Sequence, residues 1–114
     1  MSMPPERGKD RAYMNYIDEL AGDIYRESGP NPQPLGWYED RILYRIYAVL
    51  ALAKGESVTN EDVHNAWAAW ACEDNDTHPS LIPFDDLELR VQQLDEPYTM
   101  AIRRVAAQRA ADIQ

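Results

Sequence analysis

The sequence predicts a small, mainly α-helical fold of about four helices, together with one extended segment that is anchored by prolines. Three observations support this fold class: apolar residues recur at helical spacing in several windows, strong strand alternation is absent, and 114 residues suit one domain with one core. Residues 1–10 combine prolines, a glycine and mixed charges, so we expect them to form a flexible tail. The single helical domain is then expected to cover residues 11–114.

The first helix is expected from about Arg11 to Arg26. Its apolar side chains recur at helical spacing and form one stripe, which consists of Tyr13, Tyr16, Ile17, Leu20 and Ile24. The sequence Ser28-Gly29-Pro30 should end the helix, because glycine suits a C-terminal turn and proline cannot continue a helix. A proline-rich connection of extended character, residues 31–36, should follow.

The second helix is expected from about Glu39 to Lys54, and Gly55 should terminate it. Its predicted buried face consists of Ile42, Ile46, Val49, Leu50 and Ala53. Arg41 and Arg45 lie one turn apart, so they share a side of this helix.

The third helix is expected to begin at Thr59 and to run to about Cys72. Thr59, followed three residues later by Asp62, fits a variant of the capping box. The predicted apolar face consists of Val63, Ala66, Trp67 and Trp70. An acidic turn, residues 73–76, should follow.

Residues 80–84 should be extended, because Pro79 and Pro83 restrict the backbone of the residues before them. The last helix is expected to start near Asp95. Pro97 would lie in its first turn, where the missing N–H costs little. One side of this helix carries Tyr98, Ile102, Val105 and Arg109.

All of the net charge of −9 comes from one acidic window. From Gly55 to Leu89 the chain holds nine of its 20 acids and no Lys or Arg, whereas the other residues hold equal numbers of acids and bases. Such a balance argues against binding to a phosphate backbone. Residues 50–70 imitate a helix-turn-helix, but the helix that would read DNA carries acids and no base. We therefore predict that the protein does not bind DNA.

The sequence contains no pattern typical of catalysis or of a metal site. His64, Cys72 and His78 have the chemistry of zinc ligands, but their spacing matches no zinc signature. There is no HExxH, no GxSxG and no glycine-rich phosphate loop. The acids around Cys72 disfavour a reactive thiolate. We therefore expect no enzymatic activity, no metal and no cofactor.

The sequence also predicts a cytoplasmic protein that does not enter membranes. No run of about 18 apolar residues is present to span a bilayer. The first ten residues lack the apolar region of a secretory signal. The single cysteine cannot form an internal disulfide, which fits a reducing compartment.

Residues 63–68 read Val-His-Asn-Ala-Trp-Ala, and residues 78–87 read His-Pro-Ser-Leu-Ile-Pro-Phe-Asp-Asp-Leu. In this order, the two stretches resemble the V-H-x-x-W-A and H-P-x-L-V-P-Y-x-x-L motifs of the repeat domain named after the ryanodine receptor, the RyR domain. The resemblance covers about residues 60–106. Its second motif contains His78, Pro79, Pro83 and Phe84, which we expect to be structural. The resemblance implies a mostly helical module with at most a short β-hairpin and without catalysis.

The resemblance also implies a ligand. In the receptor, paired repeats hold an adenine nucleotide between aromatic side chains, and the tryptophan of the first motif, which corresponds to Trp67, is one of them. We therefore predict a module that recognises a nucleotide-like small molecule, with Trp67 stacking on the base and His64 orienting it. Phosphates require cations, and the candidate residues are Arg41, Arg45, Arg103 and Arg104. Because microbial and phage members are suspected nucleotide sensors, a phage-encoded sensor or sponge that counters host defence is expected.

Two other interpretations stay open. An acidic surface that carries aromatic side chains suits a basic protein partner or a homodimer, with Trp and Tyr as anchors. In a purely structural interpretation, His64, His78, Pro79 and Pro83 only build the fold, and Trp67 belongs to the core. The environment of the Trp67 indole distinguishes these interpretations, because a ligand site requires it to line an open cleft.

Overall fold

The computed structural model describes residues 15–29 and 34–113, with the backbone alone described for residues 34–39 and 113. Within this part there is no strand, and four long helices dominate: α2 (Tyr16–Ser28), α3 (Pro34–Lys54), α4 (Asn60–Ala71) and α6 (Glu96–Ile113). The remaining elements are the short helix α5 (Leu89–Gln92) and the 3-10 turns Gly55–Ser57, Phe84–Asp86 and Gln93–Asp95. The predicted mainly α fold is confirmed. The tail predicted for residues 1–10 and the helix start predicted at Arg11 lie outside the described residues.

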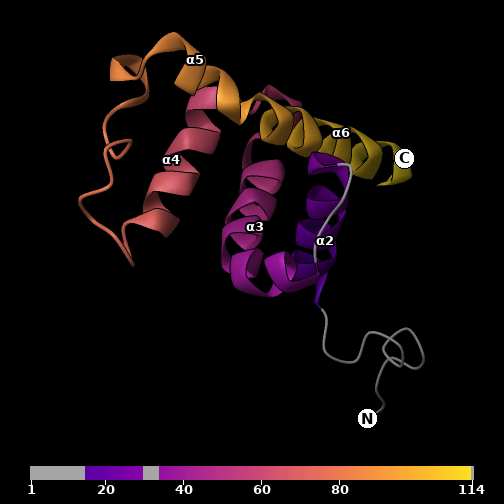
Figure 1. The fold of residues 1–114 in the computed structure, drawn as a ribbon. Helices are drawn as coiled ribbons and strands as arrows, with labels where there is room; N and C mark the ends of the chain where they lie inside the picture. The colour runs from indigo at the N-terminus through magenta and orange to yellow at the C-terminus, as the bar shows by residue number, and fades with distance from the viewer. Residues whose placement is uncertain (1–14, 30–33, 114) are drawn as a thin grey trace.

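Three of the helices form a bundle, and the fourth extends it to one side. α2 and α3 lie side by side, and α6 packs across them at one end of the pair (Figure 1). α4 lies on the opposite side of α3 from α2 (Figure 1). The segment between α4 and α5 forms the outer edge of the molecule beyond α4 (Figure 1). The described helices therefore leave α3 between two neighbours, α2 and α4.

One hydrophobic core joins all four long helices. Its buried side chains are Leu20, Ala21, Ile24, Leu43, Tyr44, Tyr47, Ala48, Ala51, Val58, Val63, Ala66, Ala101, Ile102, Val105 and Ala106. Ile24, Val58, Val63 and Ile102 are the largest of the fully buried side chains. Complete burial of such a side chain contributes about 1.5–3 kcal/mol to folding. Of the stripe predicted for the first helix, Leu20 and Ile24 are in this core, whereas Tyr16 is 62% exposed and Tyr13 lies outside the described residues.

Local signals position the ends of the helices largely as the sequence predicts. The hydroxyl of Thr59 accepts the backbone N–H of Asp62 at 3.2 Å, and the carboxylate of Asp62 accepts the backbone N–H of Thr59 at 2.9 Å, which completes the capping box of α4. Gly55 ends α3 in the left-handed conformation, with a φ of 58° that side chains disfavour. Pro97 lies in the first turn of α6, as predicted.

The segment predicted to be extended over residues 80–84 is confirmed only in part, because Ser80 lies in a turn and Phe84 begins a 3-10 turn. Residues 75–83 form neither helix nor strand. Pro83 has φ −55° and ψ 145°, and it leads directly into the 3-10 turn at Phe84–Asp86. No helix in the described residues combines the length and the apolar character that crossing a membrane requires.

The start of α3 differs from the prediction. The helix begins at Pro34, five residues before Glu39, so the expected extended connection is helical from Pro34 onward. Proline is well suited to the first turn of a helix, since its fixed φ matches the helix and its missing N–H would have no partner there. Pro34 therefore begins the helix and does not interrupt it.

The buried face predicted for this helix is wrong for three of its five residues. Ile46 and Leu50 are half-buried and pack against the core. The structure exposes Ile42 by 47% and Val49 by 53%, and Ala53 is exposed as well. The buried residues of α3 are instead Leu43, Tyr44, Tyr47, Ala48 and Ala51. Because α3 is apolar on nearly all sides, periodicity alone did not identify the buried stripe. Packing between α2 and α4 turned the tyrosine-bearing side inward.

Candidate functional site

A cleft of about 520 Å³ lies between α3, α4 and the start of α6. This volume is within the range of small-molecule sites, which is about 300–1,000 Å³. The described residues that line it are Asp40, Leu43, Tyr44, Tyr47, His64, Trp67, Trp70, His78, Ser80, Val91, Leu94, Asp95 and Tyr98. The half-buried indole of Trp67 therefore lines an open cleft and is not sealed in the core.

The α3 side of the cleft is a wall of tyrosines. The rings of Tyr44 and Tyr47 meet edge to face, with centroids 5.2 Å apart, and the ring of Tyr98 from α6 lies 6.0 Å from that of Tyr47. Burial raises the pKa of Tyr44 to about 12, and it raises the pKa of Tyr47 far above the ordinary value. Both phenols are therefore neutral. Tyr44 and Tyr47 are only 6% and 2% exposed, so they form the buried base of this wall, and Tyr98 is its half-buried ring.

The α4 side of the cleft is built around Trp67. His64 precedes it by three residues and so lies on the same face of α4. The two rings are stacked, with centroids 5.8 Å apart and an interplanar angle of 29°. His78 comes from the segment after α4 and meets the indole edge to face at 5.1 Å. The indole is thus held between two imidazoles while one part of it remains open to the cleft.

The two histidines also hold the segment after α4 in place. His64 is 4% exposed, and its Nε2 lies 2.8 Å from the carbonyl oxygen of Ile82. A carbonyl oxygen only accepts, so this nitrogen carries the hydrogen and donates it. The Nδ1 of His78 accepts the backbone N–H of Ser80 at 3.0 Å, which requires a lone pair on that nitrogen. His64 and His78 therefore have a structural function whatever the cleft binds.

The remaining members of the second sequence motif support the same segment. Phe84 is half-buried, and its ring lies 6.0 Å from that of His64. Pro79 and Pro83 are exposed and do not line the cleft. Their effect is confined to the backbone, where Pro83 holds the extended conformation before the 3-10 turn.

Two acids line the cleft. Asp40 precedes the tyrosine wall on α3, and Asp95 ends the 3-10 turn before α6. Burial raises the pKa of the Asp95 carboxyl above its ordinary value, and the neighbouring His64 opposes part of that rise. Among the residues that the structure describes, the Asp95 carboxylate has no hydrogen-bond or ion-pair partner. The carboxylate is only half-buried and can be hydrated, since no fully buried side-chain N or O atom in the described residues lacks a hydrogen-bond partner.

The arginines suggested as phosphate ligands do not line the cleft. Arg45 forms two hydrogen bonds with the buried Asp18 of α2, at 2.7 and 3.3 Å. Arg103 donates to the carbonyl oxygen of Val58 at 2.7 Å, and Arg104 donates to the Glu27 carboxylate at 3.1 Å. Arg41 is likewise absent from the lining of the cleft. The structure thus brings Trp67 and His64 together and places all four candidate cations elsewhere.

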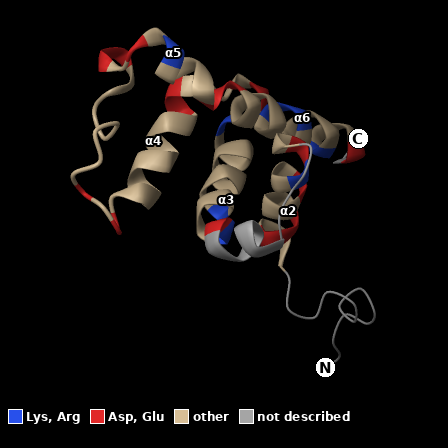
Figure 2. Cartoon of the chain, viewed as in Figure 1, with Lys and Arg blue, Asp and Glu red and all other residues tan. Residues whose placement is uncertain are grey.

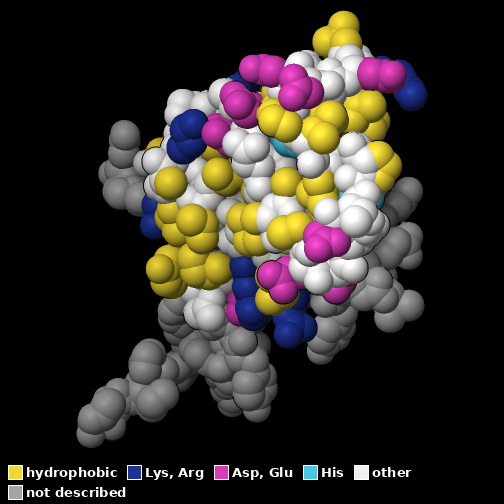
Figure 3. Space-filling view, turned by 90° about the vertical axis from the view of Figure 1, so that its left-hand side faces the viewer, with side chains coloured by type: hydrophobic (Ala, Val, Ile, Leu, Met, Phe, Trp, Pro, Cys, Tyr) yellow, Lys and Arg dark blue, Asp and Glu magenta, His cyan; other side chains and the backbone are white. Residues whose placement is uncertain are grey.

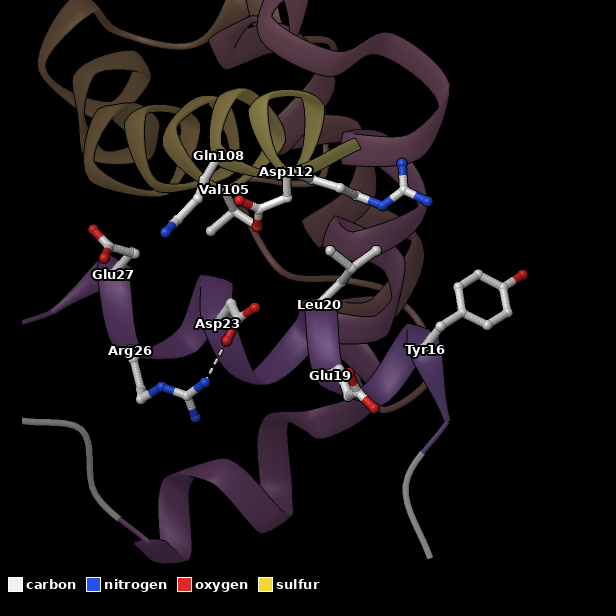
Figure 4. Close-up of a pocket in the computed structure, with 10 residues that line it drawn as sticks. Tyr16, Glu19, Leu20, Asp23, Arg26, Glu27, Val105, Gln108 and Asp112 are labelled. Carbon is white, nitrogen blue, oxygen red and sulfur yellow. Dashed lines mark hydrogen bonds and ion pairs between the residues drawn. The ribbon is translucent and has the colours of Figure 1, made fainter. Parts of the chain in front are cut away.

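A second pocket, of about 360 Å³, lies between α2 and α6 (Figure 4). Its walls carry acids and bases side by side, and Arg26 is paired with Asp23 within it (Figure 4). In the described residues no group of three or more His, Cys, Asp or Glu side chains is arranged to hold a metal ion. The cleft with Trp67 is therefore the better candidate, because it combines aromatic surface with an unpaired charge.

The face of the molecule that carries α4 and the following segment is apolar across its middle. Figure 3 shows hydrophobic side chains gathered there, with acidic side chains along the upper edge of the view. Leu94, which lines the cleft, is 68% exposed. Apolar surface that continues from a cleft onto the outer face is typical of a binding site.

Comparison with known families decides the classification of this domain. A family model described as a domain of unknown function, DUF7701, matches residues 15–107. The chain belongs to this family. The match covers α2, α3, α4, the segment after α4 and α6 up to residue 107, so it includes every described residue that lines the cleft. Searches of curated proteins and of solved structures returned no match.

The resemblance to the RyR domain is wrong, because the matching family is DUF7701 and no match to the RyR family occurs. The two motifs that suggested it have a simpler physical basis in this fold. His64 and Trp67 are one turn apart on α4, and His78, with the prolines after it, fixes the segment that packs against them. A helix and a neighbouring segment of this kind do not identify one family.

Several residues of the cleft were not predicted from the sequence as site residues. Tyr44 and Tyr47 were overlooked because the other side of their helix was taken as buried. Asp95 was read only as the start of the last helix, and Asp40 carried no signal. The sequence contains only weak signals for these residues. Tyr44 and Tyr47 lie three residues apart on one helix, and Asp95 lies one turn before Tyr98.

Proposed function

We propose that this DUF7701 domain is a non-enzymatic binding module whose ligand occupies the aromatic cleft. The observation that carries the proposal is the position of Trp67, which presents part of its indole to a cleft of about 520 Å³ opposite the tyrosine wall. The half-buried rings of Trp67, Trp70 and Tyr98 line this cleft, and aromatic surface of this kind favours a planar or a cationic group. The imidazoles of His64 and His78 are hydrogen-bonded to backbone groups, and this favours a binding function over a catalytic one.

The cleft supports the predicted nucleotide only in part. Trp67 offers a surface on which a nucleobase can stack. However, the described lining contains no Lys or Arg to neutralise phosphates, and it contains two acids. Nucleotide binding therefore stays a prediction, and a nucleoside fits the cleft better than a nucleotide. The sensor or sponge role followed from the RyR resemblance and is not part of the proposal.

Calorimetric titration of the purified protein tests the proposal. The panel contains nucleobases, nucleosides, nucleotides and small organic cations. The expected result is saturable heat with at least one of them, abolished in Trp67→Ala because the stacking surface is removed. Tyr16→Ala is the matched control, since Tyr16 is also aromatic and is 62% exposed on α2 away from the cleft.

The control should bind as the wild type does, and circular dichroism should show that both variants remain helical. Equal binding by Trp67→Ala and the wild type would move the site away from the cleft. Absence of heat with the whole panel would overturn the ligand-binding proposal itself.

A second candidate function is self-association through α3. Ile42, Val49 and Ala53 are exposed along one face of this helix, and Ile46 between them is half-buried. An apolar stripe of this kind can pair with the same stripe of a second copy, as in the predicted homodimer. Light scattering tests it: a dimer that Val49→Glu converts to a monomer supports self-association, and a monomeric wild type at all concentrations excludes it.

We also propose that the protein functions in the cytoplasm. The observation in favour is Cys72, which is a free and exposed thiol. Exposed thiols persist in reducing compartments. Recovery of the protein in an oxidising compartment after cell fractionation would contradict this location.

A further inference from the structure

One stripe of side chains on α4 follows the cleft. His64, Trp67 and Trp70 lie at helical spacing on α4, and all three line the cleft. Leu94 also lines the cleft, and because it is 68% exposed it lies at the rim. A small molecule inside the cleft would leave most of this leucine in water. The apolar surface along α4 is therefore larger than the cleft itself, which suits a larger occupant.

The His64 end of the stripe meets an acidic turn. The ring of Phe84 lies 6.0 Å from that of His64, and Asp85 and Asp86 follow Phe84 in the same 3-10 turn. The side-chain amide of Gln92 donates to the carbonyl oxygen of Phe84 at 3.0 Å, so this turn is tied to α5. Both aspartates are exposed. Two carboxylates therefore lie in solvent beside this end of the stripe.

The Trp70 end of the stripe meets a second acidic turn. The backbone N–H of Glu73 donates to the carbonyl oxygen of Trp70 at 3.3 Å, and Asp74 and Asp76 follow along the chain. All three acids are exposed. Figure 2 shows Asp and Glu in both places, after α4 and before α5, and the sequence holds no Lys or Arg between them. The face along α4 is therefore apolar in its middle and negative at both ends.

We infer that this face, which consists of the α4 stripe, Leu94 and the acidic turns at residues 73–76 and 85–86, docks a helix of another protein that is apolar along one side and carries Lys or Arg at both ends. The described residues contain no strand whose edge could pair with an extended peptide, so the fitting mode is a helix in a groove. α4 has 12 residues and so spans about 18 Å, which sets the partner helix at about three turns.

The partner would cover Leu94 and the open side of Trp67 with its apolar residues, while its basic ends face the two acidic turns. Complementary charge at both ends fixes the register of the helix on the face. The inference goes beyond the proposed function, because it concerns the face around the cleft and holds with or without a small ligand inside.

Charge disfavours the other occupants of this face. In a symmetric dimer the same face of a second copy would lie opposite, so each acidic end would meet another acidic end. The anionic surface of a membrane and the phosphates of a nucleic acid have the same sign of charge as the two turns. A basic protein segment complements the apolar middle and both ends at once.

Calorimetric titration of the purified protein with three synthetic peptides, each of about 12 residues to match α4, tests the inference. The basic peptide carries Leu along one helical side and Lys at both ends. The acidic peptide has Glu in place of each Lys, and the polar peptide has Ser in place of each Leu. We expect the basic peptide to bind at least about tenfold more tightly than either of the others.

Equal binding of the acidic peptide would remove the charge complementarity, and equal binding of the polar peptide would remove the apolar docking. Either result, or no binding by any peptide, overturns the inference.

The matched pair Leu94→Ser and Leu89→Ser locates the peptide. Both leucines are 68% exposed, but only Leu94 lines the cleft. Leu94→Ser should weaken binding of the basic peptide about tenfold, as expected for the loss of one apolar side chain from an interface. Leu89→Ser should leave the affinity unchanged. Equal effects of the two substitutions would place the peptide elsewhere and contradict the inference.

The matched pair Asp86→Lys and Glu56→Lys tests the charge. Both residues are exposed acids in 3-10 turns, but Glu56 belongs to the turn Gly55–Ser57, which is not part of the face. Asp86→Lys should weaken binding of the basic peptide and strengthen binding of the acidic one, whereas Glu56→Lys should do neither. Equal effects would reduce the preference to net charge and overturn the inference.

The other outcomes separate this inference from the proposed function. If a compound of the small-molecule panel binds at Trp67 and no peptide binds, the proposed function stands and the inference fails. If the basic peptide binds and the panel gives no heat, the inference stands without a small ligand. A dimer of the wild type that Leu94→Ser dissociates would assign the face to a second copy, and sedimentation with anionic phospholipid vesicles would assign it to a membrane; each would overturn the inference.

Discussion

Charged side chains are arranged differently in two regions of the molecule. One region is the bundle of α2, α3 and α6, and the other is the acidic window from Gly55 to Leu89. In the bundle, Arg45 is paired with Asp18 and Arg104 with Glu27 across helices. Figure 2 shows Lys and Arg on α3 and α6, whereas the turn that follows α4 carries Asp and Glu. In the acidic window, the exposed acids at positions 73, 74, 76, 85 and 86 have no ion pair within the described residues. The comparison separates charges that are paired between helices from charges that are exposed to solvent. The cleft lies at the border of the two regions.

The largest expected effect concerns the bundle core. Ile102→Ala should lower the free energy of unfolding by about 2–5 kcal/mol, because Ile102 is fully buried and its truncation leaves a cavity. Leu89→Ala is the control, since Leu89 is 68% exposed and should change stability by less than about 1 kcal/mol. Urea denaturation measures both. Similar losses in the two variants would contradict the described core.

The next effect tests whether a bundle arginine is structural. Arg45→Met should cost on the order of 1–3 kcal/mol, because it leaves the Asp18 carboxylate buried without its partner. Ligand binding should be unchanged, since Arg45 does not line the cleft. Arg90→Met is the comparison, because the Arg90–Glu88 pair is exposed and should contribute almost nothing. Loss of binding in Arg45→Met would restore this residue as a ligand contact.

The smallest expected effect is a pH-dependent increase in the stability of the Asp95→Asn variant over that of the wild type. The raised pKa of Asp95 means that its contribution to stability is present below its ordinary pKa, about 3.9, and is lost as pH rises through the folded-state pKa. Asp95→Asn stays neutral, so it should unfold at a higher temperature than the wild type near pH 7, with a gap that shrinks toward pH 4.

Calorimetry between pH 4 and pH 7 measures the difference in unfolding temperature between Asp95→Asn and the wild type. Glu96→Gln is the control, because it removes the same charge. The titratable groups that act on Asp95, namely His64 and Tyr47, are present in every variant. A wild type that is as stable as Asp95→Asn near neutral pH would mean that the carboxylate is already compensated.

The sequence predicted the helices better than their packing. Caps and breaks act locally, so Thr59 with Asp62 and Gly55 could be identified without the fold. The orientation of α3 could not, because apolar residues surround that helix and only its neighbours decide which side is buried. The unpaired state of Asp95 likewise depends on what α3, α4 and α6 bring beside it. Trp67 was proposed as a ligand contact through the RyR resemblance, which is wrong; its position in the lining of the cleft depends on how α3 and α6 pack against α4.

The central claim is that Trp67 forms one wall of a binding cleft. The most direct test follows its indole N–H signal during titration with the panel of nucleobases, nucleosides, nucleotides and small organic cations, with the signal assigned through Trp67→Phe. The account predicts a saturable shift of this signal with at least one compound of the panel, and the same shift in Tyr16→Ala. A Trp67 signal that stays fixed while other signals of the protein saturate would place the ligand elsewhere and contradict the account.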